Sequence, residues 1–257
     1  MSSRHRYTFD LPICCLFVSA LLYALMGSTQ QRKQVVPAAL ANRDVRVLFL
    51  GNSLTAANDL PAMVQAMAAK GWIRLTYKAF VQGGFNLEDH WNDGQSLPAL
   101  RGEKWDYVVL QQGPSTLPAS QADLKKWSKI WADEARKVGA KPALYMVWPF
   151  QNQADGFQLV SKSYRAAAKE SKSGIFAAGV AWEQSIYLKL GIRLYLPDRL
   201  HPTPAGSYLA ALIITHGLTD LRIREAPTKL TLASGHTYNL SEADAKLLRI
   251  AAEVATK

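Results

Sequence analysis

The chain has 257 residues, of which 49% are hydrophobic and 19% charged, and its formal net charge is +10. This composition supports a sizeable buried core and excludes disordered, collagen-like and coiled-coil proteins. The two cysteines, Cys14 and Cys15, are adjacent, which excludes a disulfide scaffold, a Cys-x-x-Cys redox pair and a cysteine-based zinc site. We predict one α/β domain, with two small domains as the alternative.

The first thirty residues differ in character from the rest. Arg4 and Arg6 precede an apolar run from Leu11 to Met26, the order found in export signals. The run is slightly shorter than the roughly 17–25 residues of a membrane-spanning helix, so a cleaved signal and a retained anchor both stay open. The predicted organisation is a signal peptide or membrane anchor (1–30), a linker (31–43) and one domain (44–257). In both cases the domain is exported, to the periplasm or the extracellular space, and residues 11–26 of a retained anchor would associate with the membrane.

The positive charge is spread along the chain. Basic residues are scattered among predicted helices, without a run of like charges or a known nucleic-acid-binding motif. We interpret them as a solvated basic surface and predict no nucleic-acid partner, because charge alone is weak evidence for one. The oligomeric state is left open.

Short apolar runs mark the predicted strands in chain order. Val45–Leu50, Tyr107–Leu110 and Ala143–Trp148 are rich in β-branched and aromatic residues and end close to Gly or Pro. Weaker strands are predicted over 75–80 and 175–180. Helical spacing predicts helices over 60–70, 124–138, 157–169, 182–190, 205–216 and 243–255, and a small hairpin over 228–238. This alternation predicts a parallel sheet with helices on both faces, and a ligand crevice at the carboxyl ends of the strands.

A serine follows the first predicted strand, in the stretch from Gly51 to Leu54. Between a buried strand and a helix, Ser53 can expose its hydroxyl in the crevice, which makes it a candidate nucleophile. An ordinary turn or helix cap is the alternative interpretation. The chain has no Gly-x-Ser-x-Gly elbow, dinucleotide fingerprint, P-loop or His-Glu-x-x-His motif.

A histidine near the other end is fixed by its neighbours. Pro202 biases His201 away from helix, and Thr203 with Pro204 starts the following helix, so His201 lies on a loop. Asp198, three residues earlier, can accept the imidazole N–H and stabilise the imidazolium. A purely structural histidine is the alternative. The pair needs only a hydroxyl to perform nucleophilic catalysis.

These residues resemble the SGNH hydrolase superfamily, also called the GDSL esterase/lipase family. Its first block, Gly-Asp/Asn-Ser-Leu, is matched by Gly51 to Leu54, and its last block, Asp-x-x-His, by Asp198 to His201. The resemblance implies a three-layer α/β/α, flavodoxin-like fold with a central, mainly parallel five-stranded sheet. It also implies that Ser53 is the nucleophile, His201 the general base and acid, and Asp198 the orienting carboxylate. No cofactor is implied.

The family's middle blocks supply an oxyanion hole, built from a glycine N–H after the second strand and an asparagine side chain after the third. By resemblance, Gly84 supplies the glycine N–H and Ser53 adds its own N–H. The third block departs from the family pattern and resembles a poorly characterised branch with Gln at this place. We assign the amide donor to Gln112, with Gln111 and Ser115 as alternatives.

Two further residues are predicted to border the substrate cleft. His90 follows the glycine loop, and Trp148 lies at a strand end, where it could form a sugar platform together with Trp91 and Phe150. Packing roles in the core are the alternative for all four side chains. No metal site is predicted, because no cluster of ligands has suitable spacing.

The combined prediction is a serine esterase that hydrolyses O-acyl esters through an acyl-enzyme. Export places it among envelope and extracellular molecules, so the expected substrate is a small-molecule or carbohydrate ester, such as an O-acetyl sugar. Two alternatives remain: a non-hydrolytic glycan- or envelope-binding module that keeps the fold, and an O-acyltransferase, which differs from a hydrolase only in the acceptor.

Overall fold

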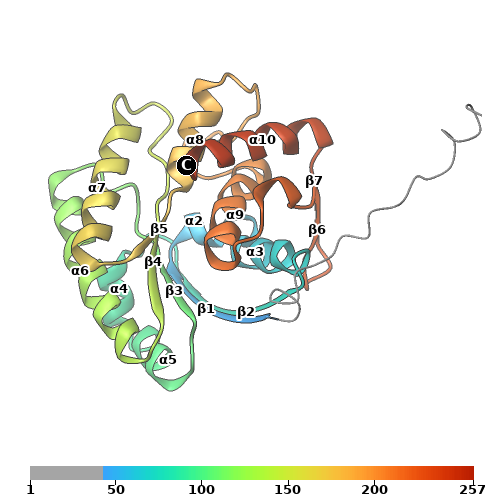
Figure 1. The fold of residues 1–257 in the computed structure, drawn as a ribbon. Helices are drawn as coiled ribbons and strands as arrows, with labels where there is room; N and C mark the ends of the chain where they lie inside the picture. The colour runs from blue at the N-terminus through green and yellow to red at the C-terminus, as the bar shows by residue number, and fades with distance from the viewer. Residues whose placement is uncertain (1–42) are drawn as a thin grey trace, which may run out of the picture. The chain divides into compact units, whose positions relative to one another are not determined.

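The computed structural model describes residues 43–257. The predicted signal peptide or anchor, and the predicted linker up to residue 42, lie outside these residues. One sheet of five parallel strands forms the centre of the domain (Figure 1). Its strands are β1 (Arg43–Gly51), β2 (Ile73–Val81), β3 (Tyr107–Leu110), β4 (Lys141–Tyr145) and β5 (Gly174–Phe176), in the order β2-β1-β3-β4-β5.

Helices cover both faces of the sheet. One face carries α4 (Leu87–Asn92), α5 (Ser96–Gly102), α6 (Pro118–Lys137) and α7 (Gly156–Ser171) (Figure 1). The other carries α3 (Leu60–Ala69), α8 (Ala178–Tyr187), α9 (Pro204–Thr219) and α10 (Glu242–Ala255). Short elements complete the domain: α2 (Ser53–Ala56), the 3₁₀ helices η1 (Ala57–Asp59) and η2 (Ile223–Glu225), and the antiparallel hairpin of β6 (Lys229–Thr231) and β7 (Thr237–Asn239). The predicted three-layer α/β/α fold is confirmed.

The strand register brings several loops to one edge of the sheet. Leu50 of β1 stands opposite Phe80 of β2 and Leu110 of β3. The residues that follow these three positions therefore emerge together, at the carboxyl ends of the parallel strands. Within residues 43–257, no helix has the length and apolar content needed to cross a bilayer.

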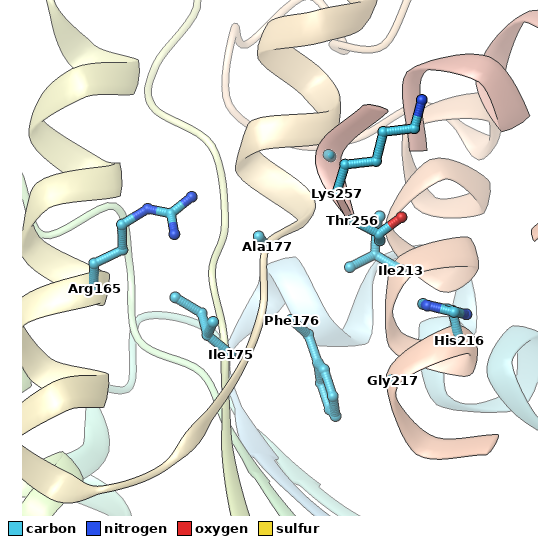
Figure 2. A pocket seen from close by; sticks show the side chains of 10 residues that line it. Arg165, Ile175, Phe176, Ala177, Ile213, His216, Gly217, Thr256 and Lys257 are labelled. Carbon is cyan, nitrogen blue, oxygen red and sulfur yellow. The ribbon is translucent and has the colours of Figure 1, made fainter. Parts of the chain in front are cut away.

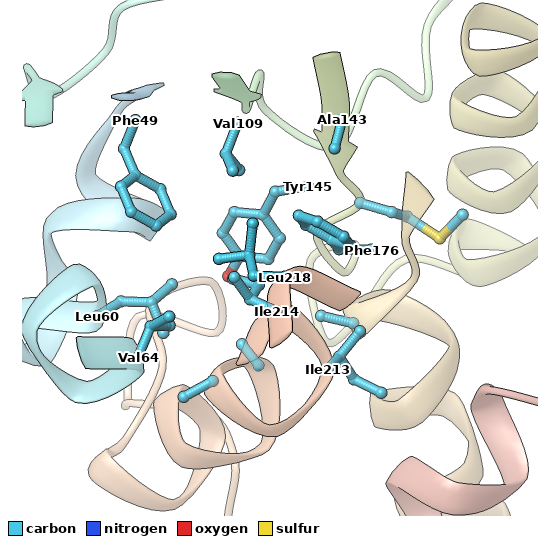
Figure 3. Packing of buried hydrophobic residues seen from close by; sticks show 14 of the residues in the cluster. Phe49, Leu60, Val64, Val109, Ala143, Tyr145, Phe176, Ile213, Ile214 and Leu218 are labelled. Carbon is cyan, nitrogen blue, oxygen red and sulfur yellow. The ribbon is translucent and has the colours of Figure 1, made fainter. Parts of the chain in front are cut away.

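The α9 face of the sheet contributes a large part of the apolar core. Ile214 and Leu218 of α9 lie near Tyr145 of the sheet, and Ile213 points toward the Phe176 side (Figure 3). Twelve of the sixteen residues of α9 are buried. A helix that is apolar on all sides is stable only when it is covered all round. This explains why α9 forms in the middle of its layer.

One glycine lets α9 approach the edge strand β5. A Cβ added to Gly217 would lie 2.2 Å from the ring of Phe176. We expect Gly217→Ala to lower the free energy of unfolding by about 1–3 kcal/mol, the usual cost of forcing atoms into a packed core. Urea unfolding measures this. Gly102→Ala is the control, because its Cβ would meet nothing within 4 Å; an equal loss in both variants would contradict the argument.

Two predicted strands end earlier in the structure than in the prediction. β4 ends at Tyr145, and the next three residues are buried without strand pairing. The strand predicted over 175–180 ends at Phe176, because α8 begins at Ala178. Gly179 packs against this stretch, where its Cβ would lie 2.1 Å from the Val147 carbonyl oxygen. The helices α4 and α5 were not predicted from the sequence. For α4 a local signal existed, the capping box of Asn86 and Asp89.

Candidate active site

Ser53 is the first residue of α2, directly beyond the carboxyl end of β1. Asn52 caps this short helix, and its Oδ1 accepts the Leu54 N–H at 3.1 Å. The Ser53 side chain is half-buried. The cap fixes the turn, so the hydroxyl projects from a defined position at the edge of the sheet.

His201 and Asp198 meet Ser53 at this edge, although 148 residues separate Ser53 from His201. His201 Nε2 lies 2.8 Å from Ser53 Oγ, and His201 Nδ1 lies 2.7 Å from Asp198 Oδ2. An ionised carboxylate only accepts, so Nδ1 carries the proton and Nε2 is free to accept the serine hydroxyl. The structure thus brings the three predicted triad residues into one hydrogen-bonded chain.

Asp198 also organises its own turn. Its Oδ1 accepts the backbone N–H groups of Leu200 at 3.0 Å and His201 at 2.9 Å. These two bonds, and then the bond from the His201 ring, lower the pKa of Asp198 below its ordinary value. Asp198 therefore remains a carboxylate under mildly acidic conditions and keeps orienting the imidazole.

The glycine loop after β2 lies beside the nucleophile turn, residues 51–55 around the candidate nucleophile Ser53. Asn52 Nδ2 donates to the Phe85 carbonyl at 3.0 Å, and Gln82 N–H donates to the Gly51 carbonyl at 3.2 Å. Gly84 has a φ of +80°, in the left-handed region that favours glycine. Among residues 43–257, the backbone N–H groups of Ser53 and Gly84 have no hydrogen-bond acceptor. Both remain free for a ligand oxygen.

The structure corrects the assignment of Gln112. Its Nε2 donates to Ser115 Oγ at 3.3 Å and to the Ser120 carbonyl at 3.2 Å, so both amide hydrogens are used. The side chain points toward the start of α6. Ser115 does not replace it, because its hydroxyl proton is donated to the Gly113 carbonyl at 3.0 Å. Neither side chain offers a donor to an ester held at Ser53.

Gln111 holds the nucleophile turn instead. Its Oε1 accepts the Asn52 N–H at 2.8 Å and the Thr55 hydroxyl at 2.7 Å. Its Nε2 donates to Asn52 Oδ1 at 3.0 Å and to the Gln112 carbonyl at 2.7 Å. The amide is 1% exposed and fully hydrogen-bonded. Gly51 makes room for this network, since its Cβ would lie 2.4 Å from Thr55 Oγ1 and 2.7 Å from Gln111 Oε1.

A buried tyrosine fixes the β3 loop from the other side. Tyr164 of α7 donates its hydroxyl to the carbonyls of Gln112 and Gly113. Burial raises the pKa of Tyr164 far above its ordinary value, so the phenol remains a donor throughout the working pH range. This anchor further restricts the loop that carries the two glutamines.

His90 does not border the substrate cleft. It is 1% exposed on the inner side of α4, and its Nε2 donates to the Gly51 carbonyl at 2.8 Å. Its Nδ1 lies 3.3 Å from Ser96 Oγ and 3.5 Å from Asp93 Oδ2. The prediction of a substrate contact is wrong, because the ring is enclosed by the protein. Its hydrogen bond instead holds the backbone of the first sequence block.

Trp148 is also buried and cannot contact a sugar. It is 0% exposed and stacks on Trp182, with ring centroids 3.5 Å apart and an interplanar angle of 5°. Trp91 packs between Trp127 and Trp131 in the opposite layer. Of the aromatic residues considered for a platform, Phe150 is 44% exposed.

Two polar residues close to Ser53 were not predicted from the sequence, Thr55 and Asn58. Thr55 donates its hydroxyl to Gln111 Oε1. Asn58 has a φ of +55°, and its Nδ2 donates to the Pro202 carbonyl at 3.0 Å. Asparagine is one of the few side chains that tolerate this backbone region, so its place between α2 and α3 was an available signal.

A cavity of about 360 Å³ lies at the β5 edge, between α7, α9 and the end of α10 (Figure 2). Arg165, Phe176, Ile213 and His216 are among the residues that line it. None of Ser53, Asp198 and His201 contributes to its wall. It is therefore distinct from the triad.

Comparisons with known proteins agree with the geometry. No protein-family model matches the sequence, and no curated protein matches it. Among solved structures, a proposed SGNH hydrolase from Slackia heliotrinireducens is 26% identical, with a TM-score of 0.59 over 68% of this chain and 98% of that chain. A DUF4886 family protein from Bacteroides uniformis is 19% identical, with a TM-score of 0.68 over 83% of this chain and 95% of that one.

An enzyme of known activity shares the fold. A catalytic mutant of an acetylxylan esterase from Geobacillus stearothermophilus is 14% identical, with a TM-score of 0.52 over 70% of this chain and 96% of that one. At this identity the likeness concerns the fold. The fold is that of SGNH hydrolases and, together with the first and last sequence blocks, it supports an ester-hydrolysing enzyme of that superfamily.

Proposed function

We propose that this chain is a serine esterase that hydrolyses O-acyl esters, with Ser53 as nucleophile, His201 as general base and acid, and Asp198 as orienting carboxylate. The observation that carries the proposal is the continuous chain from Ser53 Oγ through the imidazole to Asp198, at 2.8 and 2.7 Å. A nucleophile within hydrogen-bond reach of a base that a third group orients is the arrangement acyl transfer requires.

The reaction proceeds in two halves. His201 Nε2 takes the Ser53 proton while Oγ attacks the ester carbonyl, and the tetrahedral oxyanion accepts the N–H groups of Ser53 and Gly84. The imidazolium then protonates the leaving alkoxide, so an alcohol departs and the acyl group stays on Ser53. In the second half, His201 deprotonates water, the acyl–Oγ bond breaks, and a carboxylic acid leaves while Ser53 regains its proton.

We further propose that the substrate is an acyl ester on a carbohydrate, with acetyl as the leading acyl group. Three observations support this class: the fold is shared with an acetylxylan esterase, Phe150 offers an exposed aromatic face, and the N-terminal sequence predicts export. The face of an aromatic ring suits the apolar face of a sugar. Phe150 stands on the loop after β4, where Gln151 N–H donates to the Arg199 carbonyl at 2.9 Å. The loop that carries Phe150 is thus bonded to the loop of His201.

One observation favours a second candidate. The third-block side chains Gln111, Gln112 and Ser115 are committed to the protein itself, so the oxyanion has two backbone donors and no side-chain donor among them. Loss of one donor typically lowers kcat by about 10²–10³. A module that binds glycan esters without hydrolysing them is therefore the alternative. An acyltransferase would use the same triad with a sugar acceptor in place of water.

Covalent labelling tests the proposal directly. We expect a fluorophosphonate to attach to Ser53 of the full-length protein, detected as one mass addition on the peptide that contains it. Ser53→Ala should abolish labelling, and His201→Ala should slow it strongly, because an unassisted hydroxyl is a poor nucleophile.

The same samples are assayed with p-nitrophenyl acetate and with an acetylated oligosaccharide. Labelling that persists in Ser53→Ala would place the nucleophile elsewhere and refute the assignment. If neither labelling nor hydrolysis occurs, the binding module is supported. Transfer of acetyl to an added sugar, without release of acetate, would support the acyltransferase.

A further inference from the structure

The loop that carries His201 is held in place by hydrogen bonds that its backbone carbonyls accept. Four consecutive carbonyls each accept a hydrogen bond from a different place: Arg199 from Gln151 N–H at 2.9 Å, Leu200 from Trp148 Nε1–H at 2.9 Å, His201 from Leu196 N–H at 2.8 Å, and Pro202 from Asn58 Nδ2–H at 3.0 Å. Two of these donors are side chains. They reach the loop from opposite sides of His201 along the chain, one position before it and one after it.

We propose that Trp148 and Asn58 are positioning residues that together hold His201 within reach of Ser53. This inference rests on the proposed esterase mechanism, in which His201 must exchange a proton with Ser53. Neither residue has a role in the triad or the oxyanion hole. Each acts through the backbone of the His201 loop.

Trp148 is a rigid donor because its ring cannot turn. It is completely buried and stacks face to face on Trp182 of α8, whose ring meets that of Tyr195 edge-on at 4.7 Å. The indole N–H therefore points in one direction, at the carbonyl of Leu200. Tyr195 adds a second tie, since its hydroxyl donates to the Pro149 carbonyl at 3.0 Å. The segment after β4 and the His201 loop are joined at several points.

Asn58 connects the same loop to the nucleophile. It lies in η1, five residues after Ser53, and the same Nδ2 donates to the Pro202 carbonyl and to Ser207 Oγ at 2.8 Å. Ser207 belongs to α9, which begins just after the loop. A short, helical stretch thus links Ser53 to the residue that follows His201, and so it limits how far the two catalytic groups can separate.

Backbone strain within the loop explains why such ties are needed. Arg199 lies between Asp198 and His201 and has a φ of +64°. A non-glycine residue in the left-handed region is strained, and such conformations persist where the surroundings enforce them. With fewer ties the loop can relax, and a displacement of about 1 Å from the productive geometry can cost about 10²-fold in rate.

Trp148→Phe tests the first tie with a matched control. It keeps an aromatic ring for the stack but removes the N–H that reaches Leu200. Trp182→Phe makes the same change in size on the other half of the stack, where the indole N–H has no partner within residues 43–257. For p-nitrophenyl acetate, we expect Trp148→Phe to lower kcat by about 10- to 100-fold with little change in KM. We expect Trp182→Phe to lower kcat by less than about threefold, at a similar urea midpoint.

Asn58→Gly tests the second tie. Glycine accepts the left-handed backbone, so the change removes the amide without adding strain. Asp59→Gly is the control, because Asp59 has nearly the same φ, +53°, and its side chain forms no hydrogen bond within the described part of the chain. We expect Asn58→Gly to lower kcat about tenfold and to slow fluorophosphonate labelling of Ser53 in proportion, and Asp59→Gly to change neither.

The outcomes separate this inference from the proposed function. Equal losses of kcat in Trp148→Phe and Trp182→Phe, each matching its loss of stability, would show that the stack only packs the core and would overturn the inference. A rise in KM with unchanged kcat would do the same. Activity that survives in Ser53→Ala would instead overturn the esterase mechanism. A loss of kcat in the Trp148 and Asn58 variants that their controls do not share would support the proposal that both residues position His201.

Discussion

Alanine at Ser53 or at His201 is expected to lower kcat/KM for p-nitrophenyl acetate by roughly 10⁴–10⁶, and the double variant is expected to be no slower than either single variant. The reason is the single proton that the two residues share across 2.8 Å. Once either partner is lost, the other has no step to catalyse. The activity that remains comes from substrate binding and from the oxyanion donors.

Initial rates of the four proteins form a double-mutant cycle for this pair. Matched controls come from the β6–β7 hairpin, where Ser234 and His236 are both exposed. Ser234→Ala and His236→Ala should leave the rate unchanged within about twofold, as surface changes usually do. Losses at Ser53 and His201 that multiplied in the double variant would show that the two residues act in separate steps. That result would contradict the shared-proton mechanism.

The residues of the triad could be predicted because local chemistry fixes them. Gly51 to Leu54 ends a buried strand, and Pro202 keeps His201 out of the helix that Thr203 caps. Parallel strands then bring the loops that follow β1, β2 and β3 to one edge, since β1 lies between β2 and β3. Sequence patterns of this kind depend on a few neighbouring residues. For that reason, predictions made from such patterns agree with the structure.

The substrate-side predictions failed because they depend on which way a side chain points. His90 turns inward because it lies on α4, a helix too short to be seen in the apolar spacing, and its ring supports the Gly51 carbonyl. Trp148 follows a strand that ends three residues early, in a segment covered by α8. Tertiary packing decides both orientations. The polar partner of each ring, a backbone carbonyl, leaves no trace in the sequence.

The two neighbouring glutamines show the same limit more sharply. Gln111 and Gln112 follow β3, where successive side chains point in opposite directions. One reaches the nucleophile turn, and the other reaches the start of α6. The sequence placed an amide near the site but could not say which of the two faces Asn52. The family resemblance favoured Gln112 as the amide at the site, whereas the hydrogen bonds show that Gln111 is the amide bonded to the nucleophile turn.

Gln111→Ala is therefore expected to have the larger effect of the two glutamine variants on catalysis. It leaves the Asn52 N–H and the Thr55 hydroxyl buried without their acceptor, at about 1–3 kcal/mol each, and it opens space beside Ser53. We expect a loss of about 2–5 kcal/mol in the free energy of unfolding, measured with urea. We also expect kcat to fall about 10²-fold, because the turn that aims Ser53 loosens.

Gln112→Ala is the matched comparison. Both amides are buried, and each substitution leaves the hydrogen-bond partners of the removed amide unpaired. Gln112→Ala removes bonds to Ser115 and Ser120, so stability should fall, but kcat should change by less than about threefold. If Gln112 were the oxyanion donor, its removal would instead lower kcat by about 10²–10³. Gln111→Glu adds a graded test, since a carboxylate can still accept from the Asn52 N–H and the Thr55 hydroxyl but cannot donate to Asn52 Oδ1 or to the Gln112 carbonyl. An activity between those of Gln111→Ala and the unaltered protein would follow if the accepted bonds position the turn. An activity as low as that of Gln111→Ala would show that the donated bonds matter more.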